Sequence, residues 1–101
     1  MSIDLGTTGN RVFLFSEDGL PVASSYREFT QFFPKPGWVE HDAIEIWNSV
    51  LLLIDDVLKK SAISPKSIAT IGITNQRETS LLWNKAGEPV HKAIVWQCRR
   101  S

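Results

Sequence analysis

The sequence is poor in cysteine and carries no excess charge of either sign. Its single thiol, Cys98, rules out an internal disulfide, which fits a reducing compartment and predicts a cytoplasmic location. Eleven acidic and eleven basic residues cancel, so no bulk attraction to nucleic acid or to an anionic membrane is expected. The longest unbroken apolar stretch, Val50–Ile54, is far too short for a membrane span. What remains is the composition of a globular protein of one domain at most, 43% hydrophobic and 22% charged.

The first thirty residues predict three strands. Met1–Asp4 has the pattern of the last residues of a strand, and Asn10–Ser16 is rich in aromatic and β-branched residues. Asp18-Gly19 is a hairpin signal, and side chains alternate in character over Pro21–Thr30. The sequence therefore predicts an antiparallel meander.

A helix is predicted next, over about Ala43–Lys60. Asp42 is the expected N-cap, and Glu45 three residues later completes a capping box. Apolar residues recur at helical spacing, and Trp47 is among those expected in the core. Leu51–Leu53 widen the apolar stripe, so we expect this helix to be covered on more than one side.

The last third predicts further strands. Ile68–Thr74 is a nearly continuous apolar run, typical of a strand buried on both faces. Residues 79–84 and 93–96 are predicted as two more strands. A meander followed by a crossover helix and a buried strand predicts an α/β fold with a mixed sheet.

The corner between two of these predicted strands, Asn75-Gln76-Arg77-Glu78, gathers polar groups at one place. A hydroxyl group both donates and accepts hydrogen bonds, so Arg77 can donate to it while Glu78 accepts from it. This combination suits a small polyhydroxylated ligand. The alternative is a surface Arg–Glu pair at a strand end, which contributes little to stability.

A second polar stretch runs from Asp4 to Arg11. Glycines such as Gly9 let the backbone approach a ligand closely, and the hydroxyls of Thr7 and Thr8 with nearby amides can hold phosphate oxygens. Arg11 can neutralise phosphate charge, and Asp4 can hold Mg²⁺ through water. The stretch lacks the Gly-Lys-Ser/Thr ending of a Walker A loop, and the alternative is an ordinary hairpin turn.

Three further residues have simpler interpretations. His41 precedes Asp42 at the helix start, where adjacent side chains rarely face each other, so a structural or surface role is expected rather than a catalytic dyad. Cys98 has no second thiol to pair with, and a packing role is expected. Trp38, after Pro36-Gly37, is expected to anchor its loop.

Four segments occur in a distinctive order: Asp4–Thr8, Lys35–Asp42, Ile71–Thr79 and Ala93–Arg100. In these segments the chain resembles the N-terminal portion of the FGGY carbohydrate kinase family, and within that family the glycerol kinases. The resemblance extends over essentially all of the 101 residues. Asn-Gln-Arg-Glu and Trp-Gln-Cys-Arg-Arg are the most specific of these segments. The resemblance implies a ribonuclease-H-like, actin-type ATPase fold, of which residues 1–101 are a part of the N-terminal domain without a complete second domain.

The resemblance also implies roles for individual residues. Arg77 and Glu78 would bind glycerol hydroxyls, and Trp96 would pack against the glycerol carbons. The nucleotide phosphates would be bound by Thr7, Thr8, Gly9 and Arg11. Asp4 would hold the Mg²⁺ ion.

The reaction implied is transfer of a phosphoryl group from MgATP to glycerol, giving glycerol 3-phosphate, with ATP and Mg²⁺ as cofactors. The family's aspartate base is expected beyond Ser101, so residues 1–101 contain no catalytic residue and are expected to be inactive alone, as a fragment. Full-length members are often homo-oligomers. The alternatives are a fragment of another FGGY sugar or polyol kinase, a noncatalytic binding or regulatory module, and an actin-like or chaperone ATPase.

Overall fold

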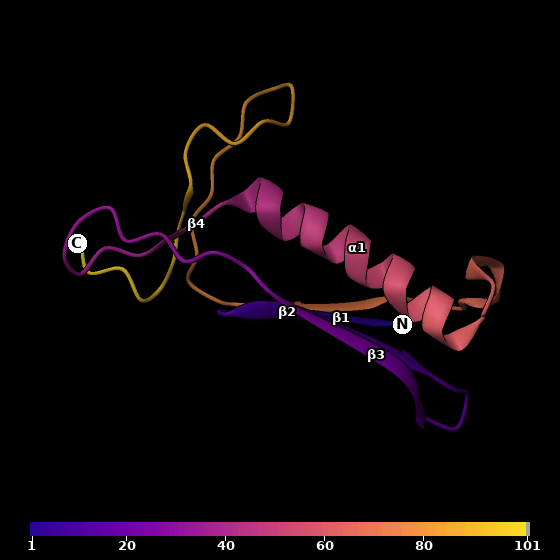
Figure 1. Ribbon diagram of the computed structural model, residues 1–101. Helices are drawn as coiled ribbons and strands as arrows, with labels where there is room; N and C mark the ends of the chain where they lie inside the picture. The colour runs from indigo at the N-terminus through magenta and orange to yellow at the C-terminus, as the bar shows by residue number, and fades with distance from the viewer. Residues whose placement is uncertain (101) are drawn as a thin grey trace.

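A mixed four-stranded sheet lies at the centre of the computed structural model, which describes residues 1–100 (Figure 1). The strands lie in the order β3-β2-β1-β5. β1 pairs antiparallel with β2 and parallel with β5, and β2 pairs antiparallel with β3. Their bounds are β1 (Ser2–Leu5), β2 (Gly9–Phe15), β3 (Pro21–Glu28) and β5 (Gly72–Asn75). The predicted meander and the predicted α/β fold with a mixed sheet are confirmed.

One long helix, α1 (Ala43–Ser61), packs on one face of this sheet (Figure 1). Asp42 caps it as predicted, because its carboxylate accepts hydrogen bonds from the backbone N–H groups of Ile44 and Glu45. The predicted capping box is wrong in its second half. The Glu45 carboxylate accepts instead from the backbone N–H of Thr30, at 2.8 and 3.2 Å. That bond ties the helix to the loop after β3. The strand itself ends two residues earlier than predicted, at Glu28, which pairs with Gly9 at the start of β2.

The core lies between α1 and the sheet. Residues at helical spacing meet alternate residues of two strands, and the cluster consists of Ile3, Val12, Leu14, Val50, Leu53 and Val57. Trp47 is not in this core, contrary to prediction, since 58% of it is exposed. Leu51 and Leu52 are also exposed, so the expectation that α1 is covered on more than one side is wrong for residues 1–100. A single sheet face covers only a narrow stripe of a helix.

The last third differs most from the sequence prediction. β5 begins only at Gly72, after a short 3-10 helix at Pro65–Ser67, and all four of its residues are exposed. Burial on both faces needs a layer on each side, whereas β5 lies at a sheet edge beyond the stripe that α1 covers. The predicted strand over residues 79–84 is reduced to isolated bridges at Ser80 and Trp83.

A second, two-stranded sheet joins β4 (Glu40–His41) to β6 (Ala93–Ile94). β6 is shorter than the strand predicted over residues 93–96. Beyond it, the chain runs beside the loop that precedes β4, where the Arg99 backbone N–H donates to the Gly37 carbonyl at 2.7 Å (Figure 1). No helix within residues 1–100 combines the length and apolar character that a bilayer-spanning segment requires.

Candidate functional site

The parallel pairing of β1 with β5 brings the two predicted polar stretches together. Parallel strands end at the same edge of a sheet, so the loop after β1 and the corner after β5 become neighbours. A hollow of about 320 Å³ opens there, lined by Thr7, Gln76, Arg77, Glu78 and Trp96. Segments about 70 and 90 residues apart in the sequence therefore form one site.

The three residues predicted to bind a polyol all line this hollow. Arg77 and Glu78 are exposed, and among residues 1–100 neither charged group pairs with the other. Glu78 has a φ of 55°, in the left-handed region that non-glycine residues rarely adopt and that recurs at ligand sites. These features count against an ordinary surface ion pair. A guanidinium, a carboxylate and a flat indole face suit a molecule with hydroxyls on one side and carbons on the other.

Trp96 also contacts the loop after β1. Its indole Nε1–H donates to Thr7 Oγ1 at 3.2 Å, so a residue predicted for the polyol touches one predicted for phosphate. Gln76 lines the hollow as well, although sequence reasoning assigned it no role. Its position directly before Arg77 in the sequence could have identified it as a residue of this site. Its backbone N–H donates to the Leu5 carbonyl at 2.8 Å, which continues the pairing of β5 with β1.

The turn predicted for phosphate is tight, since the Gly6 backbone N–H donates to the Gly9 carbonyl at 3.0 Å. Thr8 is exposed at its tip. Gly9 is buried under β3, where an added Cβ would lie 2.5 Å from the Tyr26 hydroxyl and 2.7 Å from the Arg27 carbonyl oxygen. The missing side chain at Gly9 is therefore needed for strand packing, whatever its backbone does for a ligand.

Arg11 and Asp4 are partners in the register of β1 and β2. The residues that flank Arg11, Asn10 and Val12, are buried toward α1, so Arg11 and Asp4 lie on the opposite face of the sheet. The Arg11 guanidinium lies 4.7 Å from the centre of the Tyr26 ring, a cation–π contact. Neither Arg11 nor Asp4 lines the hollow.

Asp4 is the only residue that the sequence suggested for a metal ion. Within residues 1–100 there is no group of three or more His, Cys, Asp or Glu side chains able to hold one. Mg²⁺ is commonly held by one or two carboxylates together with water and substrate phosphates. An exposed carboxylate near the end of β1 fits that requirement as one ligand among several.

His41 has a structural position, as predicted, and forms no dyad with Asp42. It is fully buried, and its ring lies edge-on to Phe29 with 4.8 Å between ring centres. Burial lowers the pKa of His41, and the nearby Glu45 carboxylate opposes that shift only in part. The ring is therefore held in its neutral form at neutral pH.

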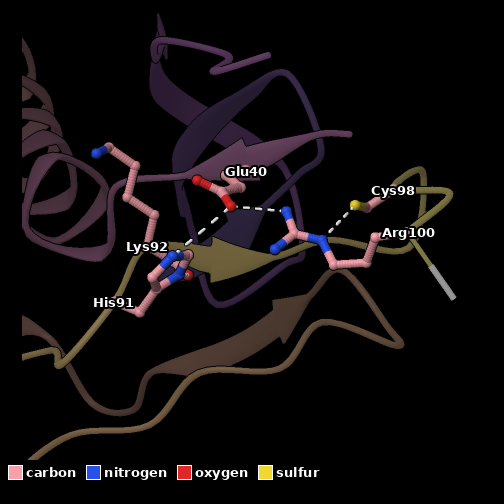
Figure 2. Close-up of polar contacts among 5 residues, drawn as sticks. All are labelled: Glu40, His91, Lys92, Cys98 and Arg100. Atoms are coloured by element: carbon pink, nitrogen blue, oxygen red, sulfur yellow. Dashed lines mark hydrogen bonds and ion pairs between the residues drawn. The ribbon is translucent and has the colours of Figure 1, made fainter. Parts of the chain in front are cut away.

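A compact cluster holds the segment that carries Trp96 (Figure 2). Arg100 Nη2 lies 2.6 Å from Oε2 of the buried Glu40, and Arg100 Nε donates to Cys98 Sγ at 2.9 Å. The same guanidinium lies 3.8 Å from the Trp38 ring centre, which confirms Trp38 as a loop anchor. Burial raises the pKa of the Cys98 thiol, but hydrogen bonds from Arg100 and from the Val39 backbone outweigh it and leave the pKa below its usual range.

The chain is similar to known proteins over its whole length. Residues 1–101 match the N-terminal domain of the FGGY family of carbohydrate kinases. A glycerol kinase of Synechocystis sp. is 56% identical over all of this chain and 21% of its own length. A glycerol kinase of Oceanobacillus iheyensis is 59% identical over all of this chain and 20% of its own. The chain thus spans about a fifth of the length of the curated relatives it matches.

Solved structures agree with the sequence matches. A Plasmodium falciparum glycerol kinase with ADP is 42% identical, with a TM-score of 0.88 over 98% of this chain and 20% of that one. A ligand-bound xylulose kinase from Lactobacillus acidophilus is 25% identical, with a TM-score of 0.86 over 97% of this chain and 20% of that one. The predicted ribonuclease-H-like fold is confirmed.

Proposed function

The chain belongs to the FGGY family of carbohydrate kinases, and from that premise we propose that it supplies part of a site at which glycerol is phosphorylated by MgATP. The observation that carries the proposal is the hollow shared by Arg77, Glu78, Trp96 and Thr7. Residues 1–101 then form part of the N-terminal domain of a longer cytoplasmic enzyme. The identity of 52–59% to glycerol kinases favours glycerol over other polyols and sugars.

The predicted residues of the hollow and of the neighbouring turn have distinct tasks in this proposal. Arg77 donates hydrogen bonds to glycerol hydroxyls and Glu78 accepts from them, while Trp96 packs against the carbons. Thr7 and Thr8 hold phosphate oxygens of ATP, and Asp4 holds Mg²⁺ through water. MgATP, when bound, supplies the phosphoryl group and the cation that neutralises its charge. The contact between Trp96 and Thr7 keeps the two ligands adjacent, as direct transfer requires.

The general base is not among these residues. Among residues 1–100, Glu78 is the one carboxylate that lines the hollow, and hydrogen bonding to glycerol occupies it. We propose that an aspartate from the rest of the complete protein removes the hydroxyl proton. The segment of residues 1–101, purified alone, is then expected to give no ATP-dependent glycerol 3-phosphate.

The test uses the complete gene product that contains this chain. We expect ATP-dependent formation of glycerol 3-phosphate, and Glu78→Gln should raise the KM for glycerol roughly 10- to 100-fold, the loss expected for a charge-assisted hydrogen bond. The KM for ATP should change little. Glu17→Gln is the matched control, because Glu17 is an exposed carboxylate in the hairpin between β2 and β3. A product that phosphorylates a pentulose but not glycerol would contradict the proposal.

A further inference from the structure

A chain of partly buried hydrogen bonds joins the loop that carries Thr7 to the corner that carries Arg77. Gln31 Nε2 donates to the Thr7 carbonyl oxygen at 3.0 Å. Gln31 Oε1 lies 2.6 Å from His41 Nε2, and His41 Nδ1 lies 3.1 Å from Gln76 Nε2. The four residues come from the turn after β1, the loop after β3, β4 and the corner that follows β5.

The Thr7 carbonyl fixes the direction of every hydrogen bond in this chain, because a carbonyl can only accept. Gln31 must therefore present its NH₂ group to Thr7 and its oxygen to His41. His41 must then carry its proton on Nε2, which leaves Nδ1 as an acceptor for Gln76 Nε2. The neutral Nε2–H tautomer satisfies both contacts at once. The other neutral tautomer would place two acceptors together at Gln31 and two donors together at Gln76.

We propose that His41 is a positioning residue of this kinase, which holds the phosphate loop and the polyol corner in a fixed relation through Gln31 and Gln76. The inference rests on the proposed function, since it assigns Thr7 to phosphate and Arg77 and Glu78 to glycerol. His41 itself touches neither ligand site. It acts by passing the hydrogen-bond direction set by Thr7 and Gln31 on to the amide of Gln76.

Two observations support this role. The lowered pKa of His41 keeps the ring neutral, as the bonding pattern requires. Gln76 Oε1 is buried and has no hydrogen-bond partner among residues 1–100. In that part of the chain, the Gln76 amide therefore has one side-chain partner, His41, which its Nε2 contacts. Within the described structure, His41 therefore decides the orientation of the Gln76 amide beside the hollow.

The competing explanation is that His41 only fills space against Phe29. The two explanations predict opposite rankings of two substitutions. Phenylalanine fills a similar volume and can keep an edge-on aromatic contact, but it offers no donor and no acceptor. Glutamine packs less well, but its amide supplies one donor and one acceptor. If packing alone matters, His41→Phe is the milder change. If positioning matters, His41→Gln is the milder change.

The experiment measures glycerol phosphorylation by the complete gene product. We expect His41→Phe to lower kcat roughly 10- to 100-fold, the loss expected from a small misplacement of reacting groups, with each KM changed much less. His41→Gln should recover most of that loss. Glu17→Gln is again the control, because Glu17 is exposed in the hairpin between β2 and β3 and outside this hydrogen-bond chain. Unfolding midpoints of all variants show whether the assayed protein is folded.

A second readout does not depend on activity. In protein labelled with ¹⁵N-histidine, the two ring nitrogens of His41 should give the signals of a neutral Nε2–H tautomer near pH 7. Signals of a charged ring or of the Nδ1–H tautomer would overturn the inference, as would a kcat for His41→Phe that equals or exceeds that of His41→Gln. If the wild-type product lacks glycerol kinase activity, the proposed function fails separately, whatever the ring signals show.

Discussion

Near the proposed site, the contacts of a single residue, Cys98, change the pKa of its thiol. Cys98 was expected only to pack, and it has no second thiol among residues 1–100. In the fold its sulfur accepts a hydrogen bond from Arg100 Nε, while Arg100 Nη2 contacts Glu40 (Figure 2). This contact favours the thiolate and, with a backbone hydrogen bond from Val39, outweighs the burial that disfavours it.

We therefore predict that Cys98 is alkylated by iodoacetamide at a lower pH than an ordinary thiol. The midpoint of the pH–rate profile should lie below the value of about 8.5 for an unfolded chain. Arg100→Gln should move that midpoint upward. Arg99→Gln should leave it unchanged, because Arg99 is the exposed neighbour and does not contact the sulfur. Identical profiles for native and denatured protein would contradict the prediction.

The sequence predicted four of the five residues that line the hollow but not the hydrogen bonds that support them. Arg77 and Glu78 stand out because their chemical types suit a polyol, whereas the role of Trp96 was implied by the family resemblance. Gln31 and His41 are ordinary polar residues in sequence, and Gln31 lies 24 residues from Thr7 while His41 lies 35 from Gln76. No local pattern encodes such pairings, which appear only when the sheet and its loops are assembled.

At the scale of elements, α1 and β5 show where sequence patterns succeed and fail. The cap and length of α1 were predicted, because capping and helical spacing are local properties. The sequence did not predict which apolar residues are buried. Apolar residues continue around α1 and along β5, whereas the described chain covers only one stripe of the helix. A pattern records which residues can be buried, and the neighbouring elements decide which ones are.

Two adjacent leucines of α1 give a direct test of that stripe. Leu53 is 3% exposed and Leu52 is 53% exposed. We predict that Leu53→Ala lowers the free energy of unfolding by about 2–5 kcal/mol, as for other buried leucines. Leu52→Ala should change it by no more than about 0.5 kcal/mol. Urea unfolding of both variants measures the difference, and equal losses would mean that another surface covers Leu52 in solution.

At the scale of the whole molecule, the hollow depends on the weakest part of the sheet. Within residues 1–100, β5 has one neighbouring strand and none of its residues is buried, whereas β2 lies between β1 and β3 and faces α1. Separation of β5 from β1 would part Arg77 and Glu78 from Thr7 while leaving the meander and the helix packed together.

We predict that the backbone amides of β5 exchange hydrogen faster than those of β2. Local opening requires little loss of buried surface at an exposed edge, so the free energy of opening should be small there and should approach the global value in β2. Hydrogen exchange followed by mass spectrometry of short peptides measures both strands in one sample. Equal protection would show that β5 is stabilised by contacts beyond residues 1–100.

The pairing of β1 with β5 also determines when the site can assemble during translation. β1, β2 and β3 leave the ribosome first, but Asn75 comes 47 positions after Glu28. At about 5–20 residues per second, translation of that interval takes roughly 2–9 seconds. During that time the nascent meander has an unpaired β1 edge, open to chaperones and to other chains. The polyol and phosphate residues meet only after β5 has been made, so the site is among the last features of this segment to form.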